Sequence, residues 1–168
     1  MNRRQKQALF IRSVALLGVV LILGVVWIMS REYRSNEYHS KAGGFSIRYP
    51  VTWSFQENTG GAAVIFFSPK ANELDFFKEN VNIVVQDISQ APMELKAYSK
   101  LAIKQMQIVF EDNFVIIESG PTFIAGQVAY KLIFLGKGPD TELKYMSVWT
   151  IKGLTAYQIT YTALSSQY

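Results

Sequence analysis

Cysteine is absent from this 168-residue sequence, and histidine occurs once, as His39. The lack of cysteine excludes disulfides, thiol nucleophiles, thiolate metal sites and a lipid anchor attached through cysteine. One histidine, in a polar stretch, provides too few partners for a zinc site or a Ser-His-Asp triad. No glycine-rich loop of the nucleotide-binding kind joins a strand to a helix. We therefore predict a protein that is not an enzyme, without catalytic residues, metal ligands or a cofactor.

Charge is missing from Ser13 to Ser30, an apolar run flanked by Arg12 and Arg31. Eighteen residues at helical rise span about 27 Å, close to the hydrocarbon thickness of a bilayer. Because backbone groups in lipid must bond to one another, the run predicts a transmembrane helix. The alternatives are a cleaved signal peptide, which has a shorter apolar core and small residues at its cleavage site, and a buried helix of a soluble domain. The length of the run and the bulky, charged residues after it favour an uncleaved anchor.

The flanking charges predict the orientation of this anchor. Four basic residues and no acidic residue precede the span, so residues 1–12 are expected to be a cytoplasmic stub near the lipid headgroups. The rest would then be periplasmic or extracellular. All 13 acidic residues follow the span and balance the remaining basic residues, so the net charge of +4 belongs to the stub. Nucleic-acid binding by the outer domain therefore has no electrostatic support.

The outer part divides into a stalk and one domain. Residues 31–44 are polar and end in Gly43-Gly44, which we interpret as a stalk, and residues 45–168 form the domain. Alternating or continuous apolar residues predict its strands, with Gly120-Pro121 ending one of them. The last strand places Tyr157, Ile159 and Tyr161 on one face and Gln158, Thr160 and Thr162 on the other. The strands are predicted over residues 45–49, 53–55, 62–67, 81–85, 114–119, 127–135, 143–151 and 154–163.

The period of the pattern changes between Pro92 and Phe110. Apolar residues there recur at intervals of three and four, which predicts an amphipathic helix. Pro92 suits the first turn of a helix, where its missing N–H costs little. A sheet with one apolar face needs a helix on that face. The outer domain is therefore expected to be an α+β fold with this helix on an antiparallel sheet.

The predicted loop before residue 81 contains the acidic residues Glu73, Asp75 and Glu79. A calcium site needs several oxygens in one loop, but Phe76 and Phe77 interrupt this group. We therefore predict a solvated loop. Aromatic residues are enriched at protein interfaces, so Phe76 and Phe77 are our first candidates for a partner-contact patch.

Four segments, in the same order, resemble the PsbP-like proteins: GFSIRYPVTW (44–53), ENVNIVVQDIS (79–89), AGQVAYKL (125–132) and VWTIKGLTAYQITYTA (148–163). The resemblance covers residues 44–168. It implies an α/β/α sandwich around an antiparallel sheet, as in the Mog1-like proteins, and no enzyme activity. Plant and cyanobacterial members are lumenal accessory proteins of photosystem II. No cofactor or metal residues carry over from the family.

The resemblance also implies a further helix after the last strand, which the sequence does not contain. Either the sequence is incomplete or a partner covers the second face of the sheet. If the chain ends at Tyr168, an exposed apolar sheet face would be a docking site.

Two functions are compatible with these features. The leading hypothesis is a single-pass membrane-anchored accessory subunit whose outer domain binds and stabilises a larger membrane protein complex. By analogy with the family, that complex would be photosynthetic or otherwise energy-converting. The alternative is an extracytoplasmic module that binds a small ligand, a lipid or a cell-wall component in a deep apolar pocket. A hydrolase with unrecognised carboxylates is a third and weaker hypothesis.

Overall fold

The computed structural model describes residues 34–138 and 141–168. The predicted stub, the span Ser13 to Ser30 and the first three residues of the stalk lie outside this part of the chain. Strands β1 and β2 belong to one compact unit. A second unit contains residues 41–43 and everything from Thr52 to the last residue.

The first unit contains an antiparallel hairpin of β1 (Ser35–Ser40) and β2 (Phe45–Pro50). Strand β2 follows the predicted alternation, but β1 lies where the sequence indicated a stalk. Its polar residues show no strand pattern of their own; they are extended because each pairs with a residue of β2, from Ser40 opposite Phe45 to Ser35 opposite Pro50. Tyr38 is buried, and its ring centroid lies 6.0 Å from that of Phe45.

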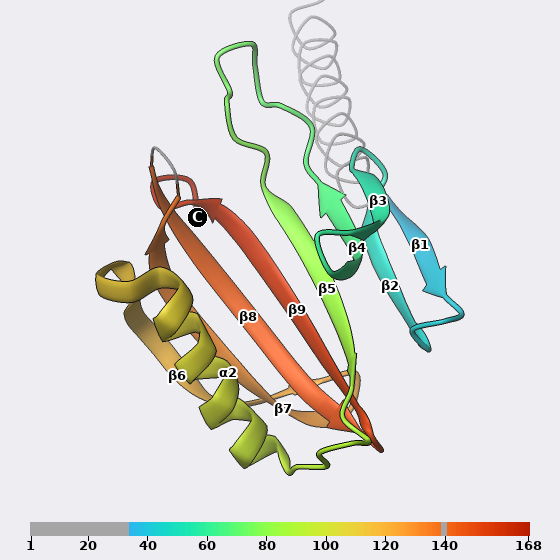
Figure 1. The fold of residues 1–168 in the computed structure, drawn as a ribbon. Helices are drawn as coiled ribbons and strands as arrows, with labels where there is room; N and C mark the ends of the chain where they lie inside the picture. The colour runs from blue at the N-terminus through green and yellow to red at the C-terminus, as the bar shows by residue number, and fades with distance from the viewer. Residues whose placement is uncertain (1–33, 139–140) are drawn as a thin grey trace, which may run out of the picture. The chain divides into compact units, whose positions relative to one another are not determined.

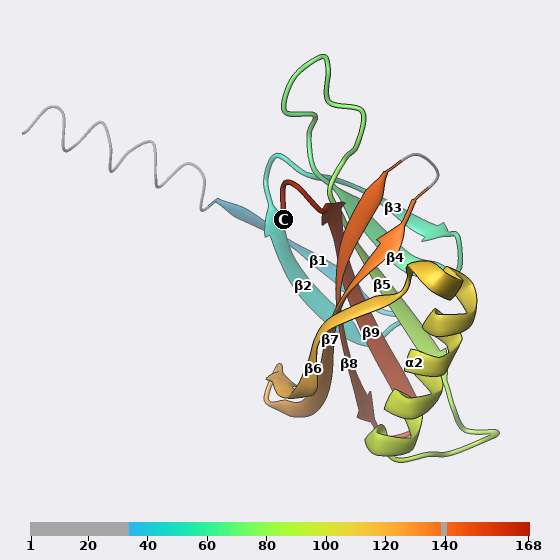
Figure 2. The same cartoon turned by 90° about the vertical axis from the view of Figure 1, so that its left-hand side faces the viewer.

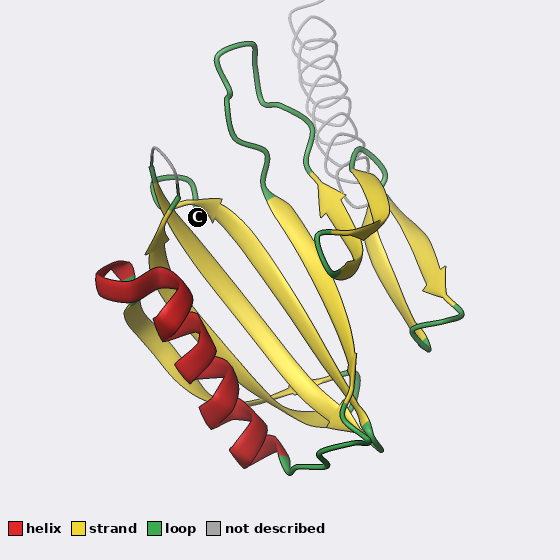
Figure 3. Ribbon diagram, viewed as in Figure 1, coloured by secondary structure: helices red, strands yellow, loops and turns green. Residues whose placement is uncertain are grey.

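The second unit is built on a seven-stranded antiparallel sheet with the order β3-β4-β5-β9-β8-β7-β6 (Figure 1). Sheet and helix account for most of this unit, as the colouring in Figure 3 shows. The strands are β3 (Ser54–Thr59), β4 (Ala62–Phe67), β5 (Asn80–Asp87), β6 (Val115–Ile124), β7 (Gln127–Lys137), β8 (Glu142–Lys152) and β9 (Thr155–Leu164). Every predicted strand of this unit is present.

Strand β6 is longer than the sequence pattern indicated. Gly120-Pro121 was expected to end it, but pairing with β7 continues to Ile124 opposite Gln127. Pro121 cannot donate a hydrogen bond to a sheet, yet β6 is an edge strand with β7 as its one neighbour in the sheet. A proline is tolerated on an edge strand because its nitrogen can face away from the partner strand.

Helix α2 (Leu95–Phe110) packs on β7 and β8 and covers that part of one side of the sheet (Figure 2). It begins three residues after Pro92, and the short 3₁₀ helix η1 (Glu111–Asn113) follows it. In the described ranges α2 is the one α-helix, so this part of the chain shows the antiparallel sheet and one helical layer of the expected α/β/α sandwich. The core under α2 contains Tyr98, Ala102, Leu132, Phe134, Trp149 and Ala156.

Strand β9 presents the more polar of its two faces to the helix. Ala156 belongs to the core under α2, so Gln158, Thr160 and Thr162 lie on the helix side of the sheet. The more apolar set of Tyr157, Ile159 and Tyr161 lies on the other side. The cause is the antiparallel register, which places Gln158 beside the buried Trp149 of β8. Thr160 pairs in the same way with Ser147, which is completely buried.

Candidate functional site

A twelve-residue loop joins β4 to β5 and extends beyond the ends of the strands (Figure 1). Its first and last residues, Ser68 and Glu79, are joined by two hydrogen bonds. The backbone N–H of Ser68 donates to the Glu79 carbonyl at 2.8 Å, and the Ser68 hydroxyl donates to Glu79 Oε2 at 2.6 Å. These bonds close the base of the loop and fix its direction of exit from the sheet.

The tip of this loop is ordered by two short polar side chains. Asp75 accepts hydrogen bonds from the backbone N–H groups of Ala71, at 2.7 Å, and Phe77, at 3.2 Å. Asn72 accepts from the N–H of Leu74 at 2.9 Å. Asp and Asn stabilise turns in this way because their side chains replace backbone partners. The tip is therefore a set of defined turns.

This ordered tip exposes two large apolar side chains. Leu74 is 89% exposed and Phe76 is 75% exposed, whereas Phe77 is half-buried. Of the predicted contact residues, the structure thus places Phe76 at the surface and turns Phe77 partly inward. Leu74 was not among the predicted contact residues. No pattern in the sequence indicated Leu74, because its exposure depends on the turn in which the Leu74 N–H donates to Asn72. We call Leu74 and Phe76 the apolar tip.

The acidic residues of the loop do not converge on a common point. The Asp75 carboxylate is occupied by backbone N–H groups, and that of Glu79 by the Ser68 hydroxyl. No three His, Asp or Glu side chains group suitably for a metal ion anywhere in residues 34–138 and 141–168. His39 lies in β1, with its Nε2 atom 3.7 Å from Glu37 Oε2.

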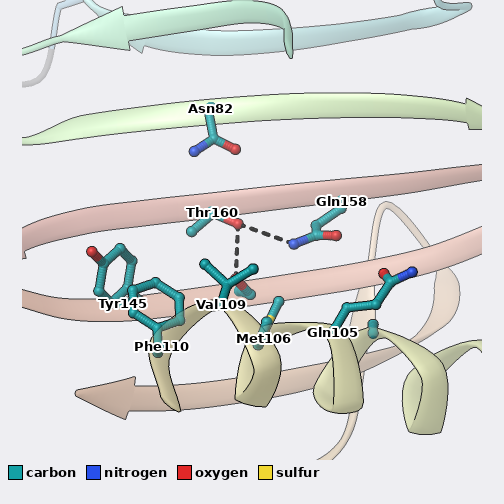
Figure 4. Close-up of a pocket in the computed structure, with 10 residues that line it drawn as sticks. Asn82, Gln105, Met106, Val109, Phe110, Tyr145, Gln158 and Thr160 are labelled. Carbon is teal, nitrogen blue, oxygen red and sulfur yellow. Dashed lines mark hydrogen bonds between the residues drawn. The ribbon is translucent and has the colours of Figure 1, made fainter. Parts of the chain in front are cut away.

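A second feature of the sheet unit is a groove beside α2, with a volume of about 310 Å³. One wall is the C-terminal half of α2, and the floor is formed by β8, β9 and β5 (Figure 4). It exists because α2 lies over β7 and β8 and leaves β9 and β5 uncovered on that side. The ten lining residues are Asn82, Ala102, Gln105, Met106, Val109, Phe110, Tyr145, Ser147, Gln158 and Thr160.

Part of the groove floor is already hydrogen-bonded. Ser147 and Thr160 share a hydrogen bond of 2.8 Å between their hydroxyls, and Gln158 Nε2 donates to Thr160 Oγ1 at 3.5 Å. Burial raises the pKa of the Tyr145 phenol above its ordinary value, which is already well above neutral pH. The Tyr145 ring stacks on Phe134 at a centroid distance of 4.7 Å. The groove thus has a fixed floor and an uncharged lining.

Two expectations from the sequence concern a membrane-spanning helix and a deep apolar pocket. None of the helices in the described part of the chain has the length and apolar character needed to cross a bilayer. The groove is open and has polar groups on its floor, whereas the alternative hypothesis expected a deep apolar pocket.

Solved structures that superpose on this chain identify its fold. PsbP from the cyanobacterium Synechocystis sp. PCC 6803 superposes with a TM-score of 0.59 at 16% identity, covering 79% of this chain and 82% of that one. The Ran-binding protein Mog1p of Saccharomyces cerevisiae gives 0.57 at 9% identity, covering 78% and 77%. This chain has a PsbP/Mog1-like fold. No family model and no curated protein matches its sequence.

A third PsbP/Mog1-like neighbour is LpqN of Mycobacterium tuberculosis, described as involved in cell envelope biogenesis. Its TM-score is 0.54 at 11% identity, with 80% of each chain covered. These identities are low, so the similarity establishes the fold of the PsbP/Mog1-like domain and not its partner. The fold that the four sequence segments indicated is thereby confirmed.

Proposed function

We propose that this chain is a non-catalytic accessory protein whose PsbP/Mog1-like domain binds a protein partner through the apolar tip, Leu74 and Phe76. The supporting observation is that two large apolar side chains are exposed on a loop whose base and turns are hydrogen-bonded. Exposing apolar groups to water costs free energy, and a rigid loop loses little entropy when a partner covers it. The Ran-binding activity of Mog1p is a precedent for protein binding by this fold.

We further propose that Ser13 to Ser30 anchors the domain in a membrane, with the N-terminus in the cytoplasm and the domain outside. Its partner would then be a larger membrane protein complex. An anchor raises the concentration of the domain near such a partner, so a small contact such as the apolar tip is sufficient. A photosynthetic or energy-converting complex is the proposal by analogy with PsbP.

The contact is tested with the double variant Leu74→Ser, Phe76→Ser. Membranes of the source organism are extracted in mild detergent, and the proteins that co-purify with wild type and variant are quantified by mass spectrometry. Phe123→Ser is the matched control, because Phe123 is 74% exposed and lies on β6 rather than on the loop. We expect the loop variant to lose the partner and the control to retain it. Equal recovery with both variants would refute the contact.

The anchor requires a separate test, the deletion of residues 1–30. We expect the deleted protein to keep the circular dichroism of the folded domain and to lose co-purification with the complex. Full recovery of the complex by the deleted protein would contradict the tethering role while leaving the contact at the apolar tip intact.

A further inference from the structure

The sheet surface in and around the groove beside α2 carries polar side chains, unlike a surface on which an apolar helix would pack. The helix-side positions of β5 and β9 form cross-strand pairs of polar residues, Asn80 with Thr162 and Asn82 with Thr160. A second helix would bury its apolar stripe on this surface, and unpaired amides there would each cost about 1–3 kcal/mol. The surface that α2 leaves open therefore favours a hydrogen-bonding occupant over an apolar helix.

Two amides of the groove remain available for such an occupant. Asn82 is half-buried on the floor and Gln105 is exposed on the α2 wall; neither side chain hydrogen-bonds to any of the described residues. Figure 4 shows Asn82 on β5 and Gln105 on α2, with Gln158 and Thr160 of β9 between them in this view. Each amide offers donors and an acceptor together, and a hydroxyl is a compact ligand group that can use both.

Apart from Gln105, the α2 wall of the groove and the adjoining part of β8 present apolar groups. These groups are Met106, Val109 and Phe110 of α2 and the ring of Tyr145, and Val109 is 74% exposed. A ligand that fits both sides has a C–H face and a hydroxyl edge, which is the amphipathic character of a sugar ring. The ten lining residues carry no charge, so an ionised ligand would lose hydration without gaining a counter-charge.

We propose that this groove is a binding site for a neutral saccharide. The ring face packs on Met106, Val109 and Tyr145, and the hydroxyls bond to Asn82, Gln105 and Gln158. The volume of about 310 Å³ lies at the lower end of ligand sites, about 300–1,000 Å³, and therefore suits one or two sugar units. The site does not depend on the apolar tip, because no residue is common to the two.

The test is a titration of the ¹⁵N-labelled full chain, kept in a zwitterionic detergent so that the detergent contributes no sugar. The probes are cellobiose and N,N′-diacetylchitobiose, with cellobionate as a charged analogue and a neutral tetrapeptide as a competing class. We expect at least one neutral disaccharide to shift the amide signals of Asn82, Gln105 and Gln158. Cellobionate and the peptide should bind more weakly.

Matched variants assign the binding to the groove. Gln105→Ala and Asn82→Ala should each weaken binding about three- to tenfold, the effect of one lost hydrogen bond. Gln107→Ala is the control, since Gln107 is an exposed glutamine of the same helix that does not line the groove. The proposal is overturned if neither disaccharide shifts these signals at its solubility limit, if the peptide or cellobionate binds more tightly, or if Gln105→Ala and Gln107→Ala bind equally.

Discussion

The indole nitrogen of Trp149 donates a hydrogen bond of 2.8 Å to the hydroxyl of Ser99, and this bond joins strand β8 to helix α2. Both side chains are buried, and the Ser99 hydroxyl in turn donates to the Leu95 carbonyl at 2.7 Å. Fifty residues separate the pair in the sequence. The bond therefore fixes where along the sheet the helix lies, and with it the groove that α2 leaves beside it.

Ser99→Ala is expected to destabilise the fold by about 1–3 kcal/mol, because the buried indole N–H loses its acceptor. Urea unfolding followed by tryptophan fluorescence measures the change. Ser54→Ala, at an exposed position of β3, is the control and should change stability by less than about 0.5 kcal/mol. If the two variants unfold at the same urea concentration, the bond does not stabilise the domain.

Gly136→Ala should also destabilise the domain, by about 1–3 kcal/mol, through overpacking. A Cβ atom at Gly136 would lie 2.6 Å from Cδ1 of Phe110, which is too close for either atom to stay in place. Gly120→Ala is a matched control on β6, where a Cβ atom meets nothing within 4 Å. Thermal unfolding compares the two.

The clash at Gly136 can also be relieved by a smaller side chain at position 110. Adding Phe110→Leu to Gly136→Ala should cost less than the sum of the two single changes, because the smaller side chain makes room for the methyl group. Additive losses would show that Gly136 is required for a reason other than the proximity of Phe110.

Stability should fall at alkaline pH because of Tyr145. Burial raises the pKa of this phenol in the folded state, so the unfolded chain loses its proton first. The stabilisation from the neutral phenol is complete below the unfolded pKa of about 10 and is lost as pH rises through the folded pKa. In urea titrations, Tyr145→Phe should reduce the loss of stability between about pH 9 and pH 11. An identical loss in wild type and variant would contradict this assignment.

Asp75→Ala should loosen the apolar tip without unfolding the domain. The carboxylate accepts from two backbone N–H groups, so its removal should speed hydrogen exchange at Ala71 and Phe77. Global stability should change by less than about 0.5 kcal/mol, since the loop is at the surface. Glu73→Ala, an exposed carboxylate of the same loop, is the control. Unchanged exchange at Ala71 and Phe77 would show that other contacts order the tip.

The sequence alone determined where the regular elements of the sheet unit lie. Alternation with a period of two marked its strands, and the change to intervals of three and four marked α2, because both patterns follow from local backbone geometry. It also indicated the PsbP/Mog1-like fold through four ordered segments. In the β4–β5 loop it pointed to Phe76, but Leu74 escaped notice because its exposure depends on turns that only the folded loop contains.

The tertiary structure determined strand pairing and the orientation of strand faces, which local sequence patterns do not specify. Pairing with β2 made a strand of the polar residues Ser35–Ser40, and an edge position allowed β6 to continue through Pro121. The register between β8 and β9 turned Gln158 and Thr160, rather than Tyr157 and Ile159, toward the helix. The hydrophobicity of a side chain does not specify which face of its strand lies against the helix, because that depends on the register with the neighbouring strand. Contacts distant in sequence, such as that between Trp149 and Ser99, make that choice, and they create the groove.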